Sequence, residues 1–148
     1  MAYTKLMYHI VFSTKERRPV IAADARPRIR EYMGGIIRNA GGSMLAANGT
    51  ADHIHIAAIG SPTIAVCKLI QLIKGNSSKW IHDTFPNLQS LYWQESYGAF
   101  TVSPSGLAKL LAYVRDQEEH HRTVDFKQEF LALLRKHGVE HDERYIWR

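Results

Sequence analysis

The chain has 148 residues, of which 45% are hydrophobic and 22% charged, a composition typical of a folded domain rather than a disordered segment. Its formal net charge of +5 suits a polyanionic partner, although basic domains that bind no nucleic acid are common. No apolar run reaches the roughly 18 residues that cross a bilayer, and the single cysteine, Cys67, excludes an internal disulfide. We therefore expect one cytoplasmic domain spanning residues 1–148, with Cys67 in its apolar core.

The first predicted element is a strand at residues 7–13, which is rich in aromatic and β-branched side chains. A charged loop follows this strand and ends at Pro19. The three cations of the loop are Lys15, Arg17 and Arg18. They are candidates to hold a phosphate backbone, but a solvated loop accounts for them equally well.

Apolar residues on one face predict a helix over residues 24–40, with Asp24 as its N-cap. Residues 43–47 predict a short second strand, and Asn48-Gly49 has the composition of a turn. A third strand is predicted at residues 52–59, where the chain reads Asp-His-Ile-His-Ile-Ala-Ala-Ile.

His53 and His55 are two positions apart in this third strand, so their side chains share one face of the sheet. Two imidazoles about 7 Å apart on a stiff strand can bind one metal ion, and Zn²⁺ is among the ions that such a pair accepts. The alternative is a pair of polar side chains on a solvated sheet face.

A second helix is predicted from Ser61-Pro62, a cap residue followed by a first-turn proline, to a stop near Pro86. Lys74 and Lys79 lie mostly off its apolar stripe, which makes this helix the best candidate for a DNA-contacting surface. A solvated helix face is the more usual meaning of such lysines.

The aromatic-rich residues 91–102 predict a bent fourth strand, broken at Gly98. A third helix is predicted from Ser103-Pro104 to about Arg122, and a fourth over residues 125–137, after which residues 145–148 form an apolar anchor. The order of elements predicts an α+β fold of the ferredoxin-like, split β-α-β-β-α-β type, with helices on one face of an antiparallel sheet plus C-terminal helices. The first and third strands would be central, and the histidines would stand on the helix-free face.

Tyr113 and Gln117 are spaced i, i+4 on the third helix, beside its apolar stripe. A tyrosine with a pKa near 10 is a poor nucleophile in water, but a metal ion that withdraws charge from a phosphodiester allows it to attack phosphorus. The Gln117 carbonyl oxygen could supply a third ligand beside the histidine pair. The alternative is an amphipathic helix edge with a solvated glutamine.

Together these residues resemble a known family. His53-Ile54-His55 is similar to the His-hydrophobic-His motif of the HUH endonucleases. Residues 113–117, Tyr-Val-Arg-Asp-Gln, resemble the single-tyrosine helix of the IS200/IS605-type transposases. The resemblance extends to residues 8–18, 70–80 and 117–121.

The resemblance implies that His53, His55 and Gln117 bind Mg²⁺ or Mn²⁺, and that Tyr113 attacks single-stranded DNA to give a 5′-phosphotyrosine and a free 3′-OH. It also implies a homodimer that recognises DNA hairpins at the ends of its element, with the tyrosine helix of one subunit placed against the histidine pair of the other. That exchange would fit a helix attached by a flexible lead, for which residues 97–98 and 103–106 are candidates. One departure from the family is that Pro104 stands where a glycine-containing turn is expected.

Two other functions stay open. A domesticated, repeat-associated relative of the same fold would bind or nick single-stranded DNA without transposition. A His-x-His metallohydrolase acting on nucleotides is disfavoured, because Ala57 stands where a histidine-triad hydrolase needs a further histidine.

Overall fold

A four-stranded antiparallel sheet forms the centre of the computed structural model, which describes residues 1–148. Its strands are β1 (Leu6–Ser13), β2 (Ser43–Gly49), β3 (His53–Gly60) and β4 (Gly98–Thr101), in the order β2-β3-β1-β4. The first and third strands are therefore central, which confirms the predicted ferredoxin-like topology. No helix has the length and apolar character of a membrane span.

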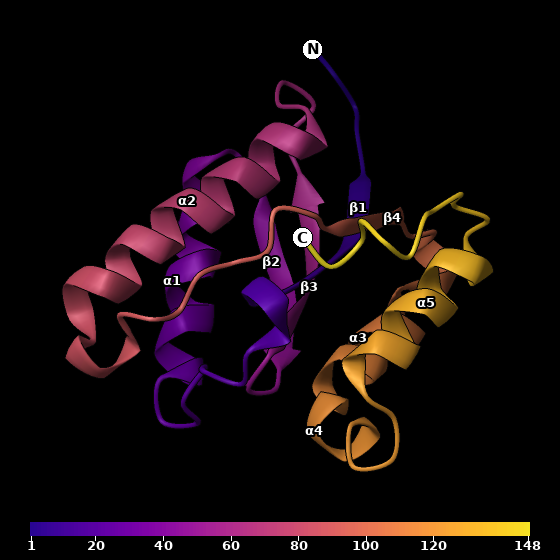
Figure 1. Cartoon of the computed structure of the whole chain (residues 1–148). Coiled ribbons are helices and arrows are strands. Elements are labelled where there is room, and N and C mark those ends of the chain that lie inside the picture. Colours follow the sequence, from indigo (N-terminus) through magenta and orange to yellow (C-terminus); the bar gives the residue numbers. More distant parts are fainter.

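Two long helices cover one face of the sheet, α1 (Arg26–Asn39) and α2 (Val66–Thr84) (Figure 1). Ile10 and Phe12 of β1 and Ile54 and Ile56 of β3 point into the main apolar core beneath these helices. Because side chains alternate along a strand, the intervening residues of β1 and β3, which include both histidines of the His-Ile-His motif, point to the opposite face.

That opposite face is also covered, and the prediction of a helix-free face is wrong. The helices α3 (Leu107–Arg115), α4 (Gln117–His120) and α5 (Phe126–Lys136) lie on this side of the sheet (Figure 1). A second apolar cluster attaches α5 to the sheet through Val11, Phe100, Phe126, Phe130 and Leu134, with Ile146 and Trp147 packed against it. The C-terminal anchor predicted from residues 145–148 is thus confirmed.

Several helix boundaries differ from the predicted ones. Asp24 does not cap α1, whose N-cap residue is Ala25 and lacks a side-chain cap. Ser61-Pro62 belongs to a turn in which the Ser61 hydroxyl accepts a hydrogen bond from the Thr63 amide, and α2 begins only at Val66. Asp125 does cap α5, by accepting a hydrogen bond from the Gln128 amide.

The predicted third helix is broken into three pieces. A 3₁₀ turn at Pro104–Gly106 leads into α3, and Asp116, at φ −93° and ψ 17°, separates α3 from α4. Two further 3₁₀ turns occur at Lys15–Arg17 and Pro86–Leu88. The break falls between the two residues of the Tyr-x-x-x-Gln pattern, but the Gln117 side chain still lies 3.3 Å from the Tyr113 carbonyl oxygen.

The predicted strand at residues 91–102 pairs only over Gly98–Thr101, and Trp93 makes an isolated bridge to Thr14. Gly98 lies where a β-carbon would come within 2.8 Å of Phe130 and 2.9 Å of Val11, so this position admits no side chain without displacing the core of α5. Asn48-Gly49 lies inside β2 instead of forming the turn, and Cys67 is exposed rather than in the core.

Candidate metal and nucleophile site

His53 and His55 project from β3 toward the helices α3, α4 and α5, and both side chains are fully buried. Their ring centroids are 5.2 Å apart. His53 Nδ1 lies 2.8 Å from Asp52 Oδ1 and 3.1 Å from Thr50 Oγ1, whereas His55 Nδ1 lies 2.7 Å from His9 Nε2. Each ring is therefore held at Nδ1 by a neighbour and turns its Nε2 toward the interior of the site.

Gln117 is buried at the start of α4, and its side chain is oriented by two contacts. The amide nitrogen donates to the Tyr113 carbonyl oxygen at 3.3 Å, which directs Oε1 toward His53 Nε2 at 3.1 Å. The Gln117 oxygen thus lies beside the histidine pair, as its spacing from Tyr113 predicted.

Tyr113 lies within the same site, on the last turn of α3. Its ring centroid is 5.6 Å from that of His55 and 6.0 Å from that of His9. Its hydroxyl donates a hydrogen bond to Glu129 Oε2. One chain therefore brings together all four residues that the sequence analysis singled out for metal binding and nucleophilic attack.

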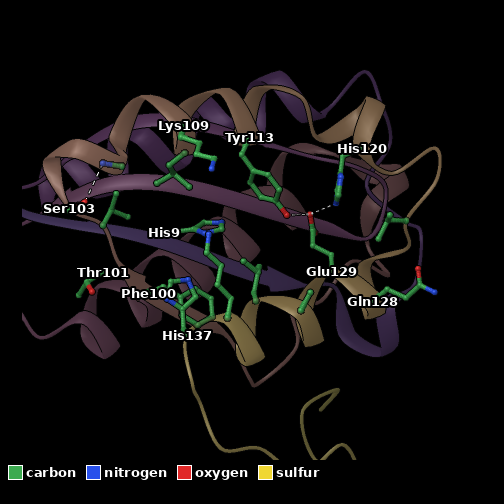
Figure 2. Close-up of a pocket in the computed structure, with 17 residues that line it drawn as sticks. His9, Phe100, Thr101, Ser103, Lys109, Tyr113, His120, Gln128, Glu129 and His137 are labelled. Atoms are coloured by element: carbon green, nitrogen blue, oxygen red, sulfur yellow. Dashed lines mark hydrogen bonds and ion pairs between the residues drawn. The ribbon is translucent and has the colours of Figure 1, made fainter.

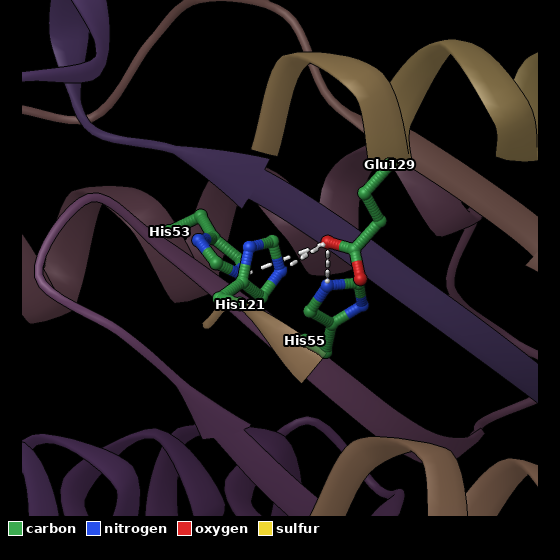
Figure 3. Close-up of side chains that lie close together, drawn as sticks. All are labelled: His53, His55, His121 and Glu129. Atoms are coloured by element: carbon green, nitrogen blue, oxygen red, sulfur yellow. Dashed lines mark hydrogen bonds and ion pairs between the residues drawn. The ribbon is translucent and has the colours of Figure 1, made fainter. Parts of the chain in front are cut away.

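Glu129 and His121 complete the cluster and were not predicted. Glu129 Oε1 lies 2.8 Å from His55 Nε2, 2.9 Å from His121 Nε2 and 3.6 Å from His53 Nε2 (Figure 3). The ligand atoms of these four residues all lie within 4.8 Å of one another. A signal for Glu129 exists in the sequence, because it is a carboxylate within the apolar stripe of α5, between Phe126 and Phe130.

The donor set fits a cation. A carboxylate only accepts hydrogen bonds, so the contact with Asp52 places the ring proton of His53 on Nδ1 and leaves a lone pair on Nε2. That lone pair faces two further acceptors, the oxygens of Gln117 and Glu129. A cation at this point, either a proton on Nε2 or a metal ion, removes the repulsion, and imidazole with carboxylate oxygen is a common ligand set for divalent metals.

Burial and the cluster's charges shift the pKa values of its members. Burial lowers the pKa of His55 to about 4, and burial together with the neighbouring His55 lowers the pKa of His9 to about 3. For Glu129, burial alone would raise the pKa, but hydrogen bonds from His121 and His55 outweigh it and hold the carboxyl well below its usual range. Burial and the hydrogen bond to Glu129 raise the pKa of the Tyr113 phenol.

The basic residues singled out in the sequence lie outside this cluster. Lys15 and Arg18 are exposed, and Arg18 pairs with Glu16 at 3.1 Å. Arg17 is partly buried, with its guanidinium 5.3 Å from the centre of the Trp147 ring. The loop itself is strained, since Glu16 and Arg17 adopt φ values of 58° and 54°.

Lys74 and Lys79 lie on α2, across the sheet from the histidines. Lys79 is exposed. Lys74 Nζ instead donates to the carbonyl oxygens of residues 94, 95 and 96 at 2.8, 3.2 and 2.8 Å. All three of its donors are used, so this lysine ties the segment before β4 to α2 and has no donor free for a phosphate.

Comparison with known proteins gives a consistent result. Residues 2–117 match the profile of the family described as "Transposase IS200 like". The chain is 22% identical over 120 residues to the ISDra2 transposase TnpA of Deinococcus radiodurans, covering 78% of this chain and 86% of that protein. It is 29% identical over 117 residues to the transposase for insertion sequence element IS200 of Salmonella typhimurium, covering 76% of each.

Two solved structures share the fold. A Deinococcus radiodurans protein assigned as a transposase superposes with a TM-score of 0.63 at 23% identity, over 78% of this chain and 93% of its own. A REP-associated tyrosine transposase bound to a REP hairpin superposes with a TM-score of 0.62 at 14% identity, over 84% and 73%. The family profile ends at Gln117, so His121 and Glu129 lie beyond the matched residues.

Proposed function

This chain belongs to the IS200-like transposase family, and we propose that it cleaves and rejoins single-stranded DNA with Tyr113 as the nucleophile. The observation that carries the proposal is the meeting of the Tyr113 hydroxyl, the His53–His55 pair and Gln117 within one buried site. Each of these groups comes from a different turn or strand, so the arrangement depends on the whole fold.

Tyr113 would attack a phosphorus of the substrate strand. Its Oη forms the new bond to phosphorus while the bond to the 3′ oxygen breaks, which gives a 5′-phosphotyrosine and a free 3′-OH. In the free protein the phenolic proton stays on Tyr113, because burial and the Glu129 carboxylate raise the pKa of the phenol. Glu129 Oε2 is the nearest acceptor for that proton as the new bond forms, and the leaving 3′ oxygen takes up a proton from water.

His53, His55 and Gln117 would hold Mg²⁺ or Mn²⁺, and we add His121 and Glu129 to the candidate ligands. The ion would draw charge from the non-bridging oxygens of the phosphodiester. Asp52 and His9 contact the Nδ1 atoms of the two strand histidines, and so fix the ring orientations on which the ligand geometry depends.

The DNA partner we propose is single-stranded DNA carrying hairpins, the substrate class expected from the family resemblance. The net charge of +5 favours such a polyanion. Exposed cations at Lys15, Arg18 and Lys79 are available to phosphates, whereas Lys74 is committed to backbone carbonyls. We therefore keep the first three as candidate DNA contacts and assign Lys74 a structural role.

The test is a covalent adduct. The protein is incubated with Mn²⁺ and single-stranded oligonucleotides that carry the hairpins flanking its own gene, and the products are separated on a denaturing gel. We expect a protein–DNA band with the wild type, none with Tyr113→Phe, and a normal band with Tyr3→Phe, since Tyr3 is 90% exposed and far from the cluster in the chain. Tyr113→Phe should still bind the oligonucleotide in a mobility-shift assay.

Two outcomes would move the assignment elsewhere. An adduct that persists in Tyr113→Phe would mean that another residue is the nucleophile. Cleaved DNA without any adduct would mean that water is the nucleophile, as in a metallohydrolase.

A further inference from the structure

A groove of about 620 Å³ runs between α3 and α5 and begins at the Tyr113–Glu129 contact (Figure 2). Its floor is the sheet, where His9 of β1 and Phe100 of β4 face it, and its walls include Leu110 of α3 and Leu133 of α5. A cavity of this size is in the range of small-molecule sites. The groove adjoins the metal cluster at Glu129, whereas His53, His55 and His121 do not line it.

Two cations flank the groove beyond the nucleophile. Lys109 precedes Tyr113 by one turn of α3, and Lys136 follows Glu129 by two turns of α5. Both side chains are exposed, and neither makes an ion pair or a hydrogen bond within the chain. Glu129 is the one carboxylate in the lining, and it lies at the end of the groove nearest the metal cluster. The rest of the groove is therefore electropositive.

The groove also carries an aromatic stack, whose exposed ring is that of His137. The rings of Phe100 and His137 are stacked, with centroids 4.3 Å apart and an interplanar angle of 14°. Phe100 is buried, whereas His137 is exposed at the groove's margin (Figure 2). Aliphatic side chains of Val102, Leu110 and Leu133 line the same groove. Aromatic rings with adjacent cations are the combination that binds unpaired bases with little dependence on sequence.

We propose, resting on the function proposed above, that this groove binds an unpaired nucleotide of the substrate DNA next to the phosphate that Tyr113 attacks. The base enters between α3 and α5 and stacks on the exposed ring of His137, and Lys109 and Lys136 hold the phosphates on either side of the opening. The occupant is single-stranded DNA because a paired base presents no free face to the Phe100–His137 stack. The groove thus holds the strand against the phenol, with little dependence on which base it receives.

The first test measures the salt dependence of DNA binding. All proteins carry Tyr113→Phe, so that no cleavage occurs, and the probe is a fluorescein-labelled dT12 strand followed by anisotropy. The double variant Lys109→Ala/Lys136→Ala is compared with Lys68→Ala/Lys127→Ala, which removes two exposed lysines outside the groove. We expect the slope of log K against log salt to fall by about 0.7 for each groove lysine, and by less for the control pair.

The second test closes the groove. Ala132 lines it from α5 and is exposed, so Ala132→Trp fills the space without disturbing the core. Loss of the stacking site should weaken dT12 binding by at least about fivefold while the thermal midpoint stays unchanged. The proposal is overturned if Ala132→Trp binds dT12 as tightly as the Tyr113→Phe parent protein. It is also overturned if the salt slope of Lys109→Ala/Lys136→Ala equals that of the control pair.

The outcome is separable from that of the proposed function. Weakened dT12 binding in both groove variants, together with a Tyr113-independent adduct, would keep the groove and remove the nucleophile. A Tyr113-dependent adduct with unchanged dT12 binding in the groove variants would keep the nucleophile and remove the groove.

Discussion

The hydroxyl of Tyr113 donates a hydrogen bond to the carboxylate of Glu129, and this contact joins α3 to α5 beside the metal cluster. The other oxygen of the same carboxylate lies within 2.9 Å of two imidazoles, those of His55 and His121. Glu129 therefore links the proposed nucleophile to the proposed metal ligands. Removing the Glu129 carboxylate should affect metal binding and the Tyr113 phenol differently, because Glu129 is a candidate ligand for the metal but a hydrogen-bond acceptor for the phenol.

Replacing Glu129 by Gln should weaken metal binding. The variant keeps the size of the side chain but removes the negative charge that four imidazoles contact, so we expect Mn²⁺ affinity to fall at least about tenfold. Isothermal titration calorimetry of the DNA-free protein measures this directly. The control is Glu118→Gln, which removes an exposed carboxylate of α4. Equal Mn²⁺ affinity in the two variants would exclude Glu129 as a ligand.

The sheet topology and the four residues proposed for chemistry could be predicted because they depend on local patterns. Alternation in β3 places His53 and His55 on one face, and the i, i+4 spacing brings Gln117 near Tyr113. The break at Asp116 could not be predicted, because residues 115–123 contain no glycine or proline that would mark the end of a helix. At the break, Gln117 Nε2 donates a hydrogen bond to the Tyr113 carbonyl oxygen, while Gln117 Oε1 lies beside His53 Nε2. This arrangement depends on a residue of β3 and not on the local sequence.

Glu129 and the covering of the histidine face could not be predicted for a different reason. Both depend on α5 returning to the sheet from a distant point in the sequence, a packing that the pattern of α5 alone does not specify. Periodicity shows that Phe126 and Phe130 are buried, but not against which face. The position of Glu129 within the apolar stripe of α5 indicates a buried carboxylate. A buried carboxylate requires partners that can donate hydrogen bonds or carry positive charge.

Gly98→Ala should destabilise the fold. A β-carbon there would lie within 3.1 Å of Phe130, Val11 and Phe100, and overpacking of this kind costs about 1–3 kcal/mol. Gly75→Ala in α2 is the matched control, because no atom lies within 4 Å of the added β-carbon and alanine favours a helix by up to about 1 kcal/mol. Urea denaturation should move the two midpoints in opposite directions. A Gly98→Ala protein as stable as wild type would show that α5 can shift freely on the sheet.

Lys74→Ala should lower stability without changing the salt dependence of DNA binding. The substitution removes three charged hydrogen bonds to the carbonyls of residues 94–96, and we expect a loss of about 1.5–3 kcal/mol in the free energy of unfolding. Lys79→Ala, on the same helix but exposed, should change stability by less than about 0.5 kcal/mol. A flatter salt slope for Lys74→Ala than for wild type would instead mean that Lys74 contacts phosphates.

Acid should destabilise the metal-free protein between about pH 6.5 and 4. Burial lowers the pKa of His55 to about 4, and burial together with His55 lowers that of His9 to about 3, from an ordinary value of 6.5. In this range the unfolded chain binds more protons than the folded chain, so the free energy of unfolding falls as the pH is lowered. The depressed pKa of Glu129 continues the loss at lower pH with the same sign.

The measurement is urea denaturation at several pH values from 7.5 to 4.5, with chelator present. We expect a loss of a few kcal/mol over the range, and a shallower dependence in His9→Gln, which removes one of the two buried imidazoles and retains a group that can hydrogen-bond His55. A stability that stays constant with pH in the wild type would show that folding does not shift the pKa values of these two imidazoles.

Cleavage should depend on Tyr113 and the histidines of the same chain. Gln117 contacts the Tyr113 carbonyl and His53 Nε2 at once, and the lead into α3 is a 3₁₀ turn at Pro104–Gly106 capped by the Ser103 hydroxyl. These contacts hold the nucleophile at its own metal site and oppose the exchange of tyrosine helices between subunits.

Mixing two inactive variants separates the arrangements. Tyr113→Phe and His53→Ala are co-expressed with different affinity tags, purified through both tags and tested for adduct formation. A hybrid dimer that acts in trans contains one complete site and forms the adduct, whereas action within one chain leaves every site defective. We expect no adduct, and a tagged wild-type chain paired with His53→Ala serves as the positive control. Because the hydrogen bond to Glu129 and the contact with Gln117 both hold Tyr113 within its own chain, restored cleavage would require α3 to leave both partners.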